Sequence, residues 1–206
     1  MTGTPSSPAA APPVARRKSA DDRRSEILRA AVDLIVETRA LPLSMKAVGD
    51  RIGASRALVY AHFSGPDALT EAILVDHLGR LEGTGIVSAA QTGEVTDRGT
   101  RAAALYLQHV AEHGPVIHVI LRDAPHGVTL SRSVTAPRNR ALRALARAAR
   151  AQLRLSSAEA IVLVELLIAV PEELGRLVHG RELALDDALA ICQRLVRSGI
   201  EAMRPG

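Results

Sequence analysis

The chain has 206 residues, of which 47% are apolar, so it is long enough and apolar enough to bury a hydrophobic core. Its aromatic residues are Tyr60, Phe63 and Tyr106, and this scarcity predicts an aliphatic, all-α protein. Cys192 is the single cysteine, which excludes an internal disulfide and a zinc site built from several cysteines. Since no run of about 18 residues is free of charges or helix breakers, we expect no membrane span. The first fifteen residues lack both a basic start and a continuous apolar run, so we expect no secretory leader and a cytoplasmic, nucleoid-associated protein.

The net charge of +4 is unevenly distributed along the chain. Residues 16–65 hold ten Lys or Arg and six Asp or Glu, whereas residues 66–206 hold sixteen of each kind. Excess positive charge confined to the first third indicates a surface that meets phosphate.

The first 18 residues are expected to form a tail. Residues 1–13 are rich in Pro, Ala, Ser and Thr and carry no charge, which predicts disorder. Arg16, Arg17 and Lys18 follow as a basic cluster, either as part of a solvated tail or as an arm that reaches the DNA minor groove.

Four helices are predicted between Ser19 and residue 81. Ser19 and Asp22 form a capping box for the first, which carries an apolar stripe and ends before Pro42. Ser44 caps the second helix, and Ser55 caps the third. Pro66 is expected in the first turn of the fourth helix. Proline is tolerated there because the N–H that it lacks would have no partner within the helix.

The remainder is predicted to be one long loop followed by five helices. Residues 82–99 are rich in Gly, Ser and Thr and are assigned to the loop. The helices are expected over residues 101–113, 115–122, 133–153, 156–179 and 186–203. Pro171 should kink or end the fourth of these.

The segment from Ser44 to Phe63 has the spacing of a helix-turn-helix. Two short helices are joined at Gly53, which adopts a left-handed backbone without steric cost, and Ala47 and Gly49 let the helices approach closely. An apolar seam is expected from Val48, Ile52, Val59 and Phe63. This seam leaves much of the third helix free to face a major groove.

The helix-turn-helix segment and the helix before it resemble a known family. The run SMKAVGDRIGASRALVYAHFSGPDAL, together with RRSEILRAAVDLIV before it, is similar to the N-terminal signature of the TetR regulators. The resemblance covers about residues 23–74. It implies a helix-turn-helix domain over residues 19–65, then a helical ligand-binding and dimerisation domain over residues 66–206.

The resemblance also implies roles for individual residues. Ser44 and Lys46 would meet phosphate, Ser55 and Arg56 would begin the recognition helix, and Ala57 and Leu58 would face base edges. Tyr60 and His62 would bind the phosphate backbone, whereas Phe63 would belong to the core. Two positions depart from the family pattern: Pro66 stands where a phosphate-binding Lys is common, and Arg39-Ala40 stands where a Gly often ends the first helix.

The C-terminal part is expected to pair two subunits and to hold an effector. The family pairs its subunits through the last two long helices, here residues 156–179 and 186–203, and the apolar run of residues 160–170 suits a buried dimer interface. The effector pocket would draw polar or aromatic groups from Tyr106, His109, His113, His118 and Arg122. His109 and His113 have a spacing that a metal could use, but no carboxylate or cysteine completes a set, so no metal and no cofactor is predicted. The alternative for these histidines is that they are surface groups or hydrogen-bonded core groups. An aliphatic pocket would suit a lipophilic effector.

The resulting hypothesis is a repressor that binds a palindromic operator as a homodimer and is released by a small molecule. An all-helical enzyme is one alternative, although the chain lacks the usual catalytic motifs. A DNA-architectural protein without a ligand is another, although such proteins spread basic charge widely.

Overall fold

The computed structural model describes residues 19–123 and 132–205. Within these ranges the chain forms ten helices and no strand, which confirms the predicted all-α class. None of these helices is long and apolar enough to cross a membrane. The predicted tail of residues 1–18 and its basic cluster lie outside the described residues.

The first four helices lie close to their predicted positions. They are α1 (Ala20–Thr38), α2 (Met45–Arg51), α3 (Arg56–His62) and α4 (Pro66–Gly83). Ser19, Ser44 and Ser55 each accept a hydrogen bond from a backbone N–H in the first turn of the helix they precede. The sequence-local capping signals therefore fix where α1, α2 and α3 begin.

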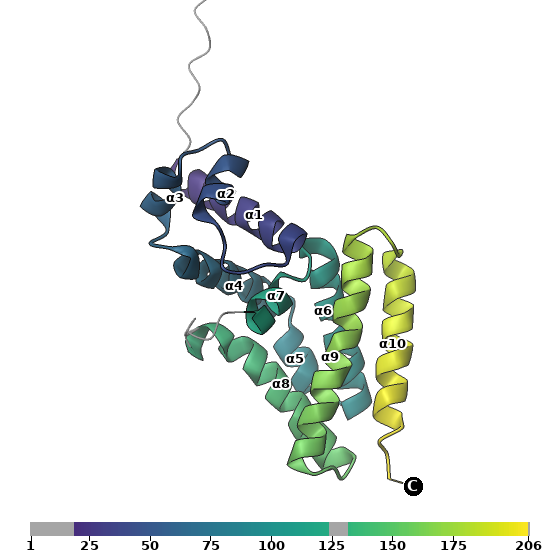
Figure 1. Ribbon diagram of the computed structural model, residues 1–206. Helices are drawn as coiled ribbons and strands as arrows, with labels where there is room; N and C mark the ends of the chain where they lie inside the picture. Colours follow the sequence, from purple (N-terminus) through teal and green to yellow (C-terminus); the bar gives the residue numbers. More distant parts are fainter. Residues whose placement is uncertain (1–18, 124–131, 206) are drawn as a thin grey trace, which may run out of the picture.

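One hydrophobic cluster joins these four helices to α7 (Val116–Asp123). Ile27 of α1, Val48 of α2, Val59 of α3 and Leu74 of α4 are fully buried in it. Figure 1 shows α1, α2 and α3 at one end of the molecule, with α4 leading from them to the other helices. Because α4 packs against α1 and also against α7, a shift of α4 would be transmitted to the helix-turn-helix.

Four other helices bury a second cluster: α6 (Val95–His113), α8 (Arg132–Gln152), α9 (Ser157–His179) and α10 (Leu185–Glu201). The short helix α5 (Ile86–Gln91) packs on α8 in a third, smaller cluster. In Figure 1, α9 and α10 lie side by side along one edge, and α8 crosses the opposite side. Gly99 of α6 and Gly175 of α9 allow close packing, since a Cβ would lie 2.6 Å from Ile200 and 2.7 Å from Val110, respectively.

One expectation about this half needs correction, and another is narrowed. The predicted loop over residues 82–99 is wrong, because α4 runs to Gly83, α5 follows, and α6 begins at Val95. Burial of Ala90 against α8 stabilises α5, whereas local composition does not predict a six-residue helix. Of the two outcomes expected at Pro171, an end of the helix is excluded: α9 continues to His179, in agreement with the expected span of residues 156–179, since its packing on α6 and α10 offsets one lost backbone hydrogen bond.

Candidate DNA interface and ligand cavity

The turn between α2 and α3 depends on two glycines. Gly53 has a φ of 64°, the left-handed conformation that the sequence predicts for it. Gly49 is buried, and a Cβ on it would lie only 2.8 Å from the carbonyl oxygen of Ala54. The backbone N–H of Ala54 donates to the Gly49 carbonyl at 2.9 Å. Close backbone contact therefore sets the angle between the two helices.

The predicted apolar seam is confirmed, and it orients α3. Val48, Val59 and Phe63 are buried, and Ile52 is partly buried against the same cluster. The opposite side of α3 faces solvent. Its predicted DNA-contact residues divide into an exposed group and a half-buried pair: Ser55, Arg56, Ala57 and Tyr60 are exposed, and Leu58 and His62 are half-buried. Tyr60 is 39% exposed, so its hydroxyl can reach a phosphate.

Two predicted DNA-binding cations have protein partners in the free chain. The Lys46 ammonium lies 2.6 Å from the carboxylate of Asp50, one turn along α2. The Arg56 guanidinium lies 5.2 Å from the centre of the Tyr60 ring and donates to its hydroxyl at 3.2 Å. Exposed contacts of this kind contribute about 1 kcal/mol or less to the stability of the fold, so contacts with phosphate can replace them. They hold the side chains of Lys46 and Arg56 at the surface before DNA arrives.

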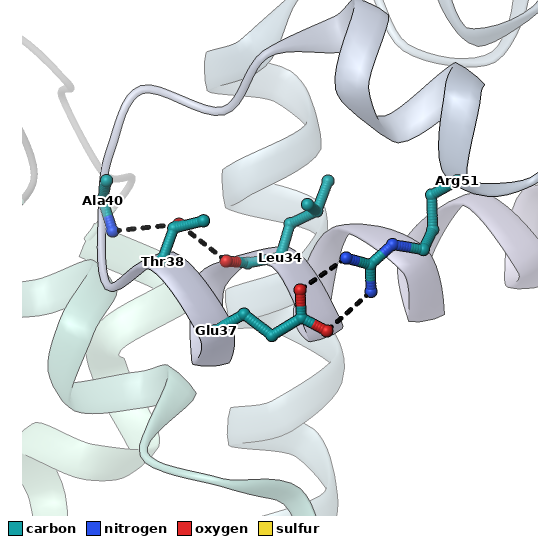
Figure 2. Close-up of polar contacts among 5 residues, drawn as sticks. All are labelled: Leu34, Glu37, Thr38, Ala40 and Arg51. Carbon is teal, nitrogen blue, oxygen red and sulfur yellow. Dashed lines mark hydrogen bonds and ion pairs between the residues drawn. The ribbon is translucent and has the colours of Figure 1, made fainter.

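The end of α1 is tied to α2 by a bidentate ion pair, shown in Figure 2. Arg51 donates from both terminal nitrogens to the carboxylate of Glu37, one bond being 2.8 Å long. This hydrogen bonding lowers the pKa of Glu37. The pair fixes the position of α2 relative to α1.

The turn after α1 forms without the glycine that the family often has there. Arg39 takes the left-handed conformation itself, with a φ of 50°, and its N–H donates to the Ile35 carbonyl. Figure 2 also shows the Thr38 hydroxyl, which donates to the Leu34 carbonyl at 2.7 Å and accepts from the Ala40 N–H at 3.3 Å. Local hydrogen bonds therefore close α1 at a non-glycine residue.

Arg24 helps to position α3 and was not predicted from the sequence. Arg24 of α1 lies over the Phe63 ring, 4.3 Å from its centre, and donates to the His62 carbonyl at 3.4 Å. It thereby links α1 to the end of α3. The contact joins residues 38 positions apart, which no local pattern reveals.

A second site is a cavity of about 130 Å³ among the helices from α4 to α10. Its walls are mostly aliphatic, with Leu78 and Leu81 of α4 on one side and Leu163 and Leu167 of α9 on another. An apolar cavity of about 150 Å³ accommodates a molecule of benzene size. The cavity can therefore take a small apolar group as it stands.

A few polar groups also line the cavity. The sequence predicts Tyr106 and His118 for this role, and the structure places both on the cavity wall together with Arg138 and Glu172, which the sequence does not single out. Within the described residues, the Tyr106 hydroxyl has no hydrogen-bond partner and the Arg138 guanidinium forms no ion pair. Both are consequently available to a ligand. Arg122, also predicted, is exposed and does not line the cavity.

His118 and Glu172 form a contact at this polar end, with Nδ1 and Oε1 2.6 Å apart. Burial raises the pKa of Glu172 to about 7, although Arg122 and Arg138 oppose the rise. Burial also raises the pKa of Tyr106, which is thus a neutral hydrogen-bond donor at neutral pH.

The two other histidines predicted to bind ligand lie outside this cavity. His109 and His113 of α6 pack edge-to-face with His77 of α4, with ring centres 4.8 to 5.4 Å apart. His77 Nδ1 and His109 Nε2 are 3.3 Å apart, so one ring donates to the other. Burial lowers the pKa of His77 to about 4 and that of His109 to about 3. In the part of the chain that the structure describes, no group of three or more His, Cys, Asp or Glu is arranged to hold a metal ion.

Residues 27–73 match the family model of the bacterial regulatory proteins, tetR family. No curated protein matches the chain by sequence.

Solved structures match over most of the chain. A TetR-like transcriptional regulator from Rhodococcus sp. RHA1 is 21% identical, with a TM-score of 0.66 over 90% of this chain and 99% of that one. The fatty acid degradation regulator FadR from Bacillus halodurans is 13% identical, with a TM-score of 0.59 over 85% and 98%. A tetR-family regulator from Streptomyces coelicolor is 23% identical, with a TM-score of 0.53 over 90% and 82%. The chain thus has the fold of TetR-type transcriptional regulators.

Proposed function

Since the N-terminal segment of this chain belongs to the tetR family and the whole follows the fold of its regulators, we propose a ligand-responsive transcriptional repressor. It binds a pseudo-palindromic operator as a homodimer and is released by a small molecule. The observation that carries the proposal is the outer side of α3, where the residues expected to contact DNA reach solvent while Val59 and Phe63 lock the helix to its core.

Specific DNA contacts follow from this side of α3. Ala57 and Leu58 present methyl groups, which can contact thymine in the major groove. Arg56 is the side chain that can read guanine, whereas Tyr60 and His62 donate to phosphates and set the register of the helix on DNA. Ser44 and Lys46 add phosphate contacts from the start of α2.

The dimer is proposed to form through α9 and α10. Large apolar side chains are exposed on these helices, with Ile161 and Val162 each 51%, Leu166 67% and Leu195 51% exposed. A four-helix interface between two copies would bury them. It would also hold two recognition helices at the spacing of about 34–36 Å that successive major grooves require.

The effector is proposed to occupy the cavity. It would have an apolar body and one anionic end that forms hydrogen bonds. The aliphatic walls would contact the body, and Tyr106 and Arg138 would bind the anionic end, because among the described residues the Tyr106 hydroxyl forms no hydrogen bond and the Arg138 guanidinium forms no ion pair. Leu78 and Leu81 line the cavity on the same helix whose first residue, Pro66, follows α3. An occupied cavity would displace α4 and thereby move the recognition helix.

A gel-shift titration tests the proposal. The protein is titrated against the promoter region beside its own gene in the presence of excess non-specific competitor DNA. A discrete complex that survives competitor is expected, and small molecules can then be screened for its release. Loss of every complex to competitor would instead favour an architectural protein, and turnover without operator preference would favour an enzyme.

A further inference from the structure

The helix α8 carries a concentration of positive charge that the neutral balance of residues 66–206 conceals. Residues 132–154 contain seven arginines and no Asp or Glu. One of them, Arg138, lines the cavity. Four further arginines of α8 are Arg140, Arg143, Arg147 and Arg150, which we term the α8 stripe.

The α8 stripe forms one row on the surface. Its members follow each other at intervals of three, four and three residues, which places them within one face of a helix over about 15 Å of its length. All four are exposed. Arg138 projects from the other side of the same helix, so the two sides of α8 have separate chemistry.

Most of this charge is uncompensated within the protein. Arg140 forms an ion pair with Glu82 at the end of α4. Arg143, Arg147 and Arg150 form no ion pair or hydrogen bond within residues 19–123 and 132–205. Like charges three and four residues apart on a helix repel each other, and a polyanion laid along the row would relieve that repulsion.

From this row we propose a second nucleic-acid contact, in which the α8 stripe binds the phosphate backbone of a DNA segment without sequence preference. Arginine suits phosphate because its planar guanidinium donates two parallel hydrogen bonds. DNA carries one charge per about 1.7 Å of axis, so about nine phosphates pass within the length of the stripe.

Other occupants fit the α8 stripe less well. The exposed residues between the arginines include no aromatic or large apolar side chain, which the centre of a protein interface needs. The apolar side of α8, including Ala141, Ala144 and Ala148, is buried in the core and cannot enter a membrane.

The position of the stripe requires a separate DNA segment. Glu82, the partner of Arg140, lies about 24 Å along α4 from Pro66, which follows the recognition helix. Figure 1 shows α8 extending away from α3 and on the side opposite α10. Since the stripe arginines are exposed and α8 is not one of the two helices of the proposed dimer interface, one molecule could hold two DNA segments at once.

The first test measures binding of the helix-turn-helix variant K46Q/R56Q, in the full chain, to a mixed-sequence 30-base-pair duplex between 50 and 200 mM salt, so that binding through the α8 stripe is followed. In that background the stripe variant R143Q/R147Q/R150Q is expected to lower the slope of log affinity against log salt by about 2.7, since each lost phosphate contact removes about 0.9. The variant R143K/R147K/R150K keeps the charge and should retain the slope of K46Q/R56Q. If the glutamine variant fails to fold, as judged by circular dichroism, the three single substitutions should each lower the slope by about 0.9.

A second measurement asks whether one protein holds two duplexes. Wild-type protein on an immobilised duplex should retain a labelled second duplex, and the stripe variant should not. The helix-turn-helix variant K46Q/R56Q should still bind duplex through the α8 stripe, which separates this inference from the proposed operator binding. An unchanged salt slope in the stripe variant would overturn the inference. So would polyglutamate binding to the stripe more tightly than the duplex at equal salt, since that would indicate an acidic protein partner.

Discussion

The helix-turn-helix and the ligand cavity are built in opposite ways. Between Ser44 and Phe63, two serine caps, two glycines and a short apolar seam fix the geometry over twenty residues. The cavity instead takes its walls from helices α4 to α10, and its polar end joins Tyr106, Arg138 and Glu172 from three different helices. Local chemistry determines the first site, and tertiary packing determines the second.

This difference predicts that the two proposed activities, operator binding and effector binding, are physically separate. A change at the helix-turn-helix should alter DNA binding and leave the cavity intact, whereas a change at the polar end of the cavity should alter only the response to an effector. The helix α4 is the element common to both, since it follows α3 and also lines the cavity. Substitutions on either side can therefore test whether the two sites are independent.

The largest effect is expected for Gly49→Val. Its Cβ would lie 2.8 Å from the Ala54 carbonyl oxygen, and two further carbons would add to that clash. We expect a loss of about 3 kcal/mol in the free energy of unfolding and about 100-fold weaker operator binding, measured by thermal denaturation and gel shift. Gly79→Ala is the matched control, because Gly79 has open space around it in α4. It should stabilise the chain by up to about 1 kcal/mol, and equal effects of the two changes would contradict the close-contact role of Gly49.

Matched changes at two tyrosines test whether DNA binding is independent of the cavity. Tyr60→Phe removes a phosphate donor and should weaken binding about tenfold across many DNA sequences, in a fluorescence-anisotropy titration. Tyr106→Phe, a matched change at the cavity, should leave DNA affinity unchanged. A loss confined to one base pair would contradict the backbone role of Tyr60.

What the sequence could predict follows the same division. The caps at Ser19, Ser44 and Ser55 were predictable because each acts on its own first turn, and Phe63 was predictable from the helical period. The resemblance to TetR regulators covers this part alone. The DNA contacts of the helix-turn-helix remain predictions.

Tertiary contacts explain what the sequence missed. Nothing near Arg138 or Glu172 in the sequence indicates that both reach one cavity. The i, i+4 pair His109 and His113 was assigned to the ligand, yet both rings face His77, which lies 32 residues before His109. The short helix α5 depends on burial of Ala90 rather than on its own composition.

A smaller effect is expected for Arg138→Met at the cavity. Loss of the guanidinium should weaken binding of alkanoates of four to ten carbons about tenfold, measured by calorimetry, because a charge-assisted hydrogen bond is lost. The matching primary amides should be affected less, and Arg143→Met, on the exposed side of the same helix, should change neither. Equal losses for carboxylate and amide, or no alkanoate binding by the wild type, would argue against an anionic effector.

The smallest effect concerns acid and the histidines between α4 and α6. His77 and His109 have folded pKa values of about 4 and about 3, below their ordinary value of 6.5. Between pH 6.5 and about 4 the unfolded chain therefore binds protons that the folded chain does not, so these two groups lower stability as pH falls through that window. Glu172 acts in the opposite direction, because its folded pKa of about 7 lies above its ordinary 4.5 and favours the folded chain as pH falls from 7 to 4.5.

In the variant Glu172→Gln, which removes the opposing group, the melting temperature should fall by about 5 °C between pH 7 and pH 5. Adding His77→Leu and His109→Leu replaces both partners of their hydrogen bond and should abolish most of that fall. Adding His62→Gln on α3 instead should leave the fall unchanged, because α3 lies apart from α6 in Figure 1. A pH profile altered equally by both additions would show that acid acts on the whole molecule rather than on the contact between α4 and α6.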